Sequence, residues 1–262
     1  MTERSRRVPV VRMARTGASA AEERVVAECP LLIRVDEEVF ASIMLTPGDE
    51  VELAVGQLLS EGVITSRADC AAITHRRDLT PEEVSVRLAG GTNVRRSASA
   101  APWLENGEPR DPLALVRARL KDCCRAAVSV DRAMLAGLLA RMVPLQTLRR
   151  ETNGTHAMAL FDERGGLVAF AEDVGRFNAL DKVIGRALLA GSLADCRICL
   201  ASSRASFGVV RKAAAARIAI LAAMSAPTSP AIELAEEAGM TLIGLLREDS
   251  FRVYAGAGRV RG

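Results

Sequence analysis

The chain has 262 residues, of which 49% are apolar and only 3% are aromatic, so it is not a disordered chain and its core must be built from Ala, Leu, Val and Ile. Such a core fits a parallel sheet covered by helices better than an aromatic-rich β-sandwich. The 35 basic and 32 acidic residues leave a formal charge of +3. This near-balance gives no sign of the strongly basic face that binds duplex nucleic acid, and we expect no nucleic-acid partner.

Residues 1–25 are rich in Arg, Ala and Ser without clear periodicity, which predicts a flexible N-terminal arm. This segment lacks the apolar core of a secretory signal, and no apolar run in the chain reaches the roughly 18 residues that cross a bilayer. The six cysteines do not make a disulfide framework in a chain of this length. We therefore expect a cytoplasmic protein with no membrane association.

A hairpin and a helix are predicted next. Two β-like runs, Leu31–Val35 and Val39–Leu45, flank the acidic turn Asp36–Glu38. Thr46–Asp49 then supplies a capping residue, a proline and an acid, which predict the start of a helix that ends at Gly62.

Val84–Leu88 alternates in the way that a strand does. Residues 89–112 are rich in Gly, Ser, Pro and Asn, which predicts an exposed loop. Together, residues 26–110 are expected to form a smaller N-terminal α+β subdomain with its loop.

Residues 111–262 show the order of predicted helices and strands that is typical of an α/β domain. Helices are predicted over Leu113–Lys121 and over Asp131–Arg150, the second interrupted near Pro144. Strands then alternate with helices: strands over Ala157–Phe161, Leu167–Phe170, Ile198–Ser202, Ile218–Met224 and Thr241–Leu246, and helices over Asn178–Ala190, Phe207–Ala216 and Thr228–Ala238. This alternation predicts a three-layer α/β domain with a mostly parallel sheet, to which Phe251–Tyr254 adds an edge strand.

In open α/β sheets, anions bind where strands end and helices begin. Three segments occupy such positions, namely Glu172–Arg176, Ser202–Ser206 and Ser225–Ser229. For either of the last two segments alone, ordinary helix N-caps explain the Ser and Thr residues better. Three such segments at corresponding positions of the sheet, two of which carry an arginine (Arg176 and Arg204), together favour an anionic ligand. Neither GxGxxG nor GxxxxGK[ST] occurs, so neither a Rossmann dinucleotide site nor a P-loop is predicted.

Five motifs together resemble the FdhD/NarQ family of formate dehydrogenase accessory proteins over roughly residues 28–256. They are TPGDEVELAVGQLLSEGVI, NGTHAMALFD, EDVGRFNALDKVIG, SSRASF and ILAAMSAPTSPAIELAEEAGMTLIGLLR. The resemblance implies a cytidine-deaminase-like α/β fold. It also implies a function, which is to carry sulfur from a cysteine desulfurase to the bis-guanine-dinucleotide form of the molybdenum cofactor before insertion into formate dehydrogenase or a related molybdoenzyme.

By the same resemblance, thirteen positions are expected to bind the cofactor: His156, Asp173, Arg176, Asn178, Lys182, Arg204, Ser206, Phe251, Arg252, Val253, Tyr254, Ala255 and Gly256. His156 alone is as well explained by a structural role. A guanine nucleotide is expected to mimic the cofactor, and a homodimer is expected because two-fold assemblies are the commonest. The metal motifs of zinc deaminases are absent, so neither deamination nor a metal site is predicted.

The family's sulfur chemistry implies a Cys-Gly-x-Cys-Gly loop, because a persulfide carrier needs an exposed thiolate. At the corresponding place this chain has Trp103–Gly107, without either cysteine. Cys123 and Cys124 are the candidates to replace them as catalytic residues, and buried structural cysteines are the competing interpretation. Cys196 and Cys199 have CxxC spacing, but they span the entry to a buried strand, which favours core packing.

Two pocket positions also differ, because relatives usually have His where this chain has Phe177 and Glu where it has Gly208. Phe177 removes a donor and a titratable group. Three functions stay open: a sulfur carrier that uses Cys123 or Cys124, a protein that holds or hands over the cofactor without sulfurating it, and a nucleotide-binding regulator outside molybdenum metabolism. The retained motif arginines argue against the third.

Overall fold

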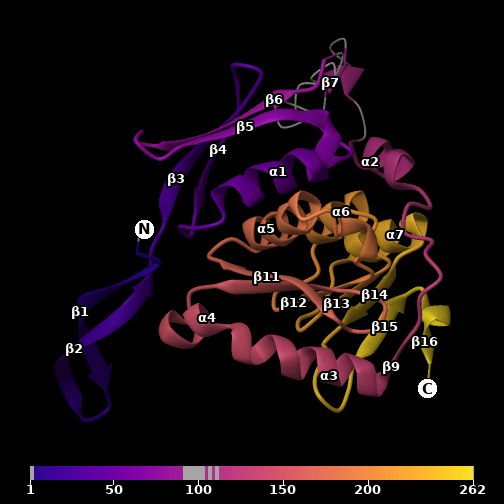
Figure 1. Cartoon of the computed structure of the whole chain (residues 1–262). Coiled ribbons are helices and arrows are strands. Elements are labelled where there is room, and N and C mark those ends of the chain that lie inside the picture. The colour runs from indigo at the N-terminus through magenta and orange to yellow at the C-terminus, as the bar shows by residue number, and fades with distance from the viewer. Residues whose placement is uncertain (1–2, 91–103, 106–107, 110–111, 262) are drawn as a thin grey trace.

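The computed structural model describes residues 3–90, 104–105, 108–109 and 112–261. Figure 1 shows a four-stranded sheet, a layer of helices, a six-stranded sheet and a second layer of helices stacked in that order, with a hairpin that extends from one side. The place of the family's cysteine loop, Trp103–Gly107, lies largely outside the described residues.

The six-stranded sheet has the order β11-β10-β12-β13-β14-β15. Its strands are β10 (His156–Phe161), β11 (Leu167–Asp173), β12 (Ile198–Ala201), β13 (Ile220–Ala223), β14 (Thr241–Gly244) and β15 (Arg252–Ala255). Strands β12, β13 and β14 are parallel, whereas β10 is antiparallel to both of its neighbours and β15 is antiparallel to β14. The predicted α/β class and the β15 edge strand are confirmed, but the sheet is mixed rather than mostly parallel.

The reason for the mixed sheet is the length of the connections. A short turn over Asp162–Gly166 joins β10 to β11, and such a connection permits only an antiparallel pair. Helices join β12 to β13 and β13 to β14, and they provide the longer crossovers that parallel strands need.

Helices cover both faces of this sheet, as a three-layer domain requires (Figure 1). One face carries α5 (Arg176–Leu189), α6 (Phe207–Ala215) and α7 (Ser229–Ala238). The other carries α3 (Arg132–Met142), and α4 (Thr147–Thr152) follows after a 3₁₀ turn over Val143–Leu145. The predicted interruption near Pro144 is therefore confirmed.

The N-terminal sheet has the order β4-β3-β6-β5, with β3 (Cys29–Val35), β4 (Glu38–Leu45), β5 (Cys70–Arg76) and β6 (Glu82–Leu88). The hairpin predicted over the first two strands is confirmed, and its turn residues Asp36 and Glu37 have positive φ angles. Alternate residues of β3 are buried, so this sheet turns one apolar face toward the rest of the molecule.

Helix α1 (Glu50–Glu61) lies between that face and helices α5 and α6 (Figure 1). It ends as predicted at Gly62, whose φ of 73° suits glycine. The helix crosses α5 at two facing glycines, because a Cβ at Gly56 would overlap the Asp181 carbonyl and one at Gly185 would overlap the Glu52 carbonyl. The division of the chain at residue 110 stays a prediction.

Residues 1–25 were predicted to form a flexible arm, but the structure has a hairpin there, with strands β1 (Ser5–Ala14) and β2 (Gly17–Val26). Most of its side chains are exposed, so the strands lack the apolar alternation that reveals a half-buried strand. Cross-strand ion pairs such as Arg12–Glu23 join the two strands instead.

The remaining short elements are β7 (Leu104–Glu105), β8 (Glu108–Pro109), α2 (Pro112–Leu120), β9 (Val130–Asp131), β16 (Val260–Arg261) and 3₁₀ turns at Arg67–Asp69, Leu193–Asp195 and Ala257–Arg259. Within the described part of the chain, no helix combines the length and the apolar character needed to span a membrane.

Candidate ligand-binding site

The three predicted anion-binding segments meet at one edge of the six-stranded sheet. Strands β11, β12 and β13 run in the same direction and end there, and β10 runs the opposite way and begins there. His156, the first residue of β10, pairs with Asp173 on one side, and the Ala157 N–H donates to Ser202 Oγ at 2.8 Å on the other. A β-bridge between Ala205 and Pro227 joins the second segment to the third.

Positive charge surrounds His156 at this edge. Burial lowers the pKa of His156, and the guanidinium groups of Arg176, Arg149 and Arg204 lower it further. Within the described residues none of these arginines forms an ion pair, although Arg149 donates to the Thr155 carbonyl at 3.0 Å. Three guanidinium groups that lack a carboxylate partner among the described residues lie near one half-buried imidazole, which makes this edge suitable for an anion.

Unsatisfied polar atoms gather at the same place. Buried polar atoms nearly always have hydrogen-bond partners, so each exception needs an explanation. Among the described side chains, five buried nitrogen or oxygen atoms have none, and three of these belong to the site: His156 Nδ1, Arg176 Nε and Ser206 Oγ. A ligand with acceptor oxygens would satisfy the arginine and the serine.

Ser206 also decides between the two interpretations of its segment. It occupies the N-cap position of α6, but its side chain makes no capping hydrogen bond. Its hydroxyl is buried without a partner. The N-cap explanation accounts for the position of Ser206 in the chain and not for its side chain, which is left available to a ligand.

Asp173 and Lys182 lie behind this edge. Both side chains are completely buried and form an ion pair of 2.7 Å. Lys182 also donates to the Thr46 carbonyl at 2.7 Å, and the Thr46 N–H donates to Asp173 at 3.0 Å. Asn178 donates to Asp173 at 3.0 Å and to the Met44 carbonyl at 2.8 Å. These predicted site residues hold the loop before α1 against the start of α5, and the two ionised side chains have no surface to offer a ligand.

Glu172 and Arg149 belong to the surroundings of the site; Glu172 lies in a predicted segment but its role there was not predicted, and Arg149 was not predicted at all. The buried carboxylate of Glu172 accepts from the Leu148 and Arg149 N–H groups at 2.9 and 2.8 Å, so it caps the start of α4. It also accepts from the Thr155 hydroxyl at 3.0 Å. This cap positions Arg149. Only the tertiary contact between α4 and β11 could have revealed that role of Glu172.

Only the first residues of the stretch Phe251–Gly256 lie at the end of the sheet where the site is. Strand β15 is antiparallel to β14, so Arg252 lies beside Gly244 at the edge where the site is. Ala255 and Gly256 lie at the other end, where the Thr241 hydroxyl donates to the Gly256 carbonyl at 2.7 Å. Because two strands separate β15 from β12, about 14 Å lie between them.

Tyr254 nevertheless approaches the third segment. A Cβ at Gly244 would lie 2.9 Å from Pro227 Cδ and 3.0 Å from Tyr254 Cε2. The glycine therefore lets the tyrosine ring and the segment that follows β13 come close together. Phe251 and Val253 pack instead against the core on the α3 side of the sheet.

Cys123 and Cys124 lie at the opposite edge. Cys123 Sγ is 3.2 Å from the Ala214 carbonyl at the end of α6, and the Cys124 N–H donates to the Ala238 carbonyl at the end of α7. Both helices begin at the candidate site, and the nine residues of α6 alone span about 14 Å. The predicted catalytic cysteines are therefore not brought together with the predicted cofactor residues.

The two thiols differ in character. Cys124 is buried, and its pKa is raised by its hydrogen bond to Cys123 and by burial. The pKa of Cys123 is lowered by the Cys124 S–H and by the positive charge of Arg217. Cys123 lines a cavity of about 790 Å³ whose wall includes four arginines: Arg67, Arg119, Arg197 and Arg217.

The CxxC pair behaves as predicted. Cys196 and Cys199 are both buried, and burial raises the pKa of each thiol to about 12. These thiols pack in the core and are not poised for redox or metal chemistry.

Comparison with known proteins places this architecture in a recognised group. The profile of the FdhD/NarQ family matches residues 26–261. The chain is 40% identical to the sulfur carrier protein FdhD of Streptomyces coelicolor, over 99% of this chain and 96% of the relative, and 37% identical to that of Saccharolobus solfataricus, over 99% and 100%. A crystal structure of a proposed formate dehydrogenase accessory protein from Desulfotalea psychrophila shares the fold, with a TM-score of 0.81, 23% identity and coverage of 99% of this chain and 100% of the other.

Proposed function

Because this chain belongs to the FdhD/NarQ family, we propose that it is a formate dehydrogenase accessory protein whose cargo is the bis-guanine-dinucleotide form of the molybdenum cofactor. The cargo binds where β11 and β12 end. The observation that carries this proposal is the group of unsatisfied atoms on His156, Arg176 and Ser206, set among arginines that form no ion pair with any carboxylate in the described part of the chain.

The donor set fits the phosphates of such a cargo. Arg176 and Arg204 offer charge-assisted hydrogen bonds, which are about twice as strong as neutral ones. The first turns of α5 and α6 face the same edge, and the unpaired N–H groups of a helix start favour an anion. A guanine nucleotide carries the same phosphates and base, so it serves as the simplest mimic.

Sulfur transfer is a second candidate activity, because the relatives are named sulfur carriers. In this chain, Cys123 is the cysteine that favours it, since its thiol has a lowered pKa and lines an arginine-rich cavity. Its position at the opposite edge of the sheet separates it from the proposed cargo site. We therefore favour a protein that holds and hands over the cofactor, with sulfuration as an activity to be tested.

The proposed partners follow from this role. They are formate dehydrogenase or a related molybdoenzyme as the client and, if sulfur is transferred, a cysteine desulfurase. A homodimer and a cytoplasmic location stay predictions.

Complementation tests the proposal. In a bacterium that lacks its own FdhD protein, the wild-type chain is expected to restore formate dehydrogenase activity, and an Arg176→Ala/Arg204→Ala variant is not. Full activity with both arginines removed would contradict the cargo site. A Cys123→Ser/Cys124→Ser variant separates the two candidate activities, because it keeps activity if the chain only holds cofactor and loses it if these thiols carry sulfur.

Intact mass measurement complements that assay. The purified chain is incubated with a cysteine desulfurase and cysteine. A gain of about one sulfur atom that disappears in the Cys123→Ser/Cys124→Ser variant supports the carrier. No gain, in a preparation that still binds guanine nucleotide, supports the protein that only holds the cofactor.

A further inference from the structure

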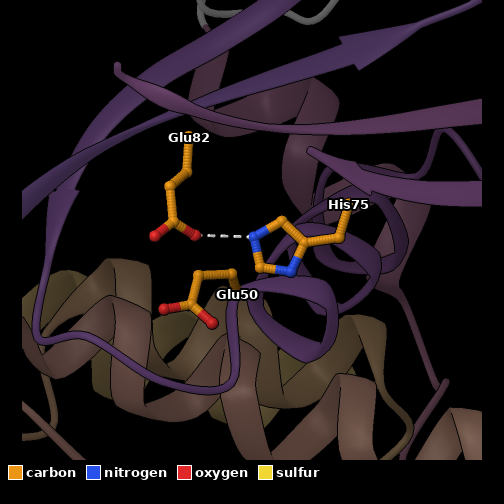
Figure 2. A group of neighbouring side chains, drawn as sticks. All are labelled: Glu50, His75 and Glu82. Carbon is orange, nitrogen blue, oxygen red and sulfur yellow. Dashed lines mark hydrogen bonds and ion pairs between the residues drawn. The ribbon is translucent and has the colours of Figure 1, made fainter. Parts of the chain in front are cut away.

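Three side chains that the proposed function does not use converge between the N-terminal sheet and the start of α1. Figure 2 shows His75 and Glu82 facing each other, with the side chain of Glu50 close beside them. Each offers a ligand atom within 4.8 Å of the other two. The His75 Nε2 to Glu82 Oε2 distance is 2.8 Å.

The pleat of the sheet explains why these groups share one face. His75 pairs with Val84, two residues beyond Glu82, and Leu31 pairs with Glu82. Paired residues point to the same side, and so do residues two apart along a strand. His75 and Glu82 therefore stand on the buried face, among core positions such as Leu31 and Val84, at the end where Glu50 begins α1.

The charges of this cluster are not balanced. Glu50 is only 8% exposed, and its one hydrogen bond within the described residues comes from the Gly48 N–H. Within the described residues Glu82 forms its ion pair with His75, and the two side chains are 24% and 10% exposed. Buried carboxylates are normally paired or bound to a metal, and here the buried Glu50 and the partly exposed Glu82 lie beside a single imidazole.

A fourth donor lies nearby. Cys29 is half-buried on β3, two residues before Leu31 and therefore on the same face. Burial raises the pKa of its thiol, and Glu50 and Glu82 raise it further, so it lies within electrostatic range of both carboxylates.

We propose that Glu50, His75 and Glu82 bind a divalent transition-metal ion, for which Zn²⁺ is the best fit. Imidazole nitrogen beside carboxylate oxygens suits zinc, and three protein ligands leave a fourth position open to water. Ligands held about 2.1 Å from a tetrahedral ion lie about 3.4 Å apart. The present spacing, from 2.8 Å to within 4.8 Å, is close to that value.

One hydrogen bond must change when the ion binds. Arg77 donates to His75 Nδ1 at 3.2 Å, which leaves the ring proton on Nε2. An ion on Nε2 requires that proton to leave or to move to Nδ1. Arg77 is exposed, so its side chain is free to swing into solvent.

Binding of the ion would affect the loop that precedes α1. The ion would join β5, β6 and the start of α1, and Glu50 directly follows the loop whose Thr46 contacts Asp173 and Lys182. Bound zinc would therefore hold that loop in place. Sequence motifs predicted no metal site, because these ligands come from three separated segments.

The test is zinc titration of the full-length protein after chelator treatment, in a Cys123→Ser/Cys124→Ser background that removes zinc binding by those thiols. We expect one zinc per chain by calorimetry and elemental analysis, and a melting temperature that rises with zinc. His75→Gln should weaken zinc binding more than about 100-fold, because losing even a supporting partner of a ligand costs 10- to 100-fold.

Glu82→Gln is the second variant, since glutamine still accepts the hydrogen bond from His75 and preserves the fold. The matched control is Glu83→Gln, because Glu83 points to the other face and pairs with Arg34 at 2.8 Å. Zinc binding that His75→Gln and Glu82→Gln leave unchanged, no zinc binding at all, or selectivity for Mg²⁺ over Zn²⁺ would overturn the proposal.

Discussion

The ring of Phe177 lies against Gly208, so closely that a Cβ at position 208 would come within 2.8 Å of Phe177 Cε1. The guanidinium of Arg176 lies over the same ring, 4.5 Å from its centroid. These are the two positions at which the family resemblance implies His and Glu. They touch in the folded chain, and the absence of a side chain at position 208 leaves room for the phenyl ring.

The first prediction concerns this pair. Gly208→Glu alone should lower the free energy of unfolding by about 1–3 kcal/mol, because the new side chain meets the ring in a packed contact. Phe177→His should offset much of that loss in the double variant. Urea unfolding of the two single variants and the double variant gives the coupling energy. Strictly additive effects would show that the two positions changed independently.

The second prediction concerns pH. The pKa of His156 is lowered by burial and by Arg176, Arg149 and Arg204, so the imidazole is neutral near pH 7. A bound anion offsets those charges and raises this pKa, so binding takes up a proton. Guanosine diphosphate should therefore bind more tightly as pH falls from about 7.5 to about 5.5, by at most tenfold per pH unit.

The control for the pH experiment is His156→Gln, which keeps a polar side chain that does not titrate. The phosphates of the nucleotide titrate equally with both proteins, so the ratio of the two affinities isolates the histidine. A ratio that stays constant across this range would show that His156 does not face the ligand.

The third prediction concerns the buried pair Asp173–Lys182. Lys182→Met should cost about 3–5 kcal/mol of stability, because it leaves a carboxylate buried without its cation. Adding Asp173→Asn should recover part of that loss. Thermal or urea unfolding measures both effects. The control is Asp78→Asn in the exposed pair with Arg76, which should change stability by less than about 1 kcal/mol.

The fourth prediction concerns the crossing of α1 and α5. Gly185→Ala should destabilise the chain by about 1–3 kcal/mol or more, because its methyl group would overlap the Glu52 carbonyl. Gly137→Ala in α3 is the matched control, since nothing lies within 4 Å of the added Cβ. Alanine should stabilise that helix by about 1 kcal/mol. Equal effects at both positions would mean that the two helices do not approach so closely.

Much of the fold was predictable because apolar periodicity and helix boundaries agree along the chain. The helix that ends at Gly62 and the alternation from Ala157 to Tyr254 are examples. Strand β5 and the N-terminal hairpin were missed, because the hairpin is exposed on both faces and β5 is rich in small residues. The direction of β10 follows from a tight turn, which strand alternation alone does not reveal.

The site was predictable in part for a similar reason. Strand-end reasoning and the motifs identified His156, Arg176, Arg204 and Ser206, which meet in space. A motif does not tell which way a side chain faces, and Lys182 points inward. Arg149 was missed because it reaches the site from α4, on a separate segment that only tertiary contacts bring there.

The most direct test of the cargo site is calorimetric titration with guanosine diphosphate of the wild-type chain, Arg176→Ala and Arg204→Ala. Arg197→Ala serves as control, because Arg197 lines the cavity at the opposite edge. Each site variant should lose about 1.5–3 kcal/mol of binding free energy, a roughly ten- to hundred-fold loss of affinity, and the control should bind like the wild type. Unchanged affinity in both site variants, or a loss only in Arg197→Ala, would contradict the proposed site.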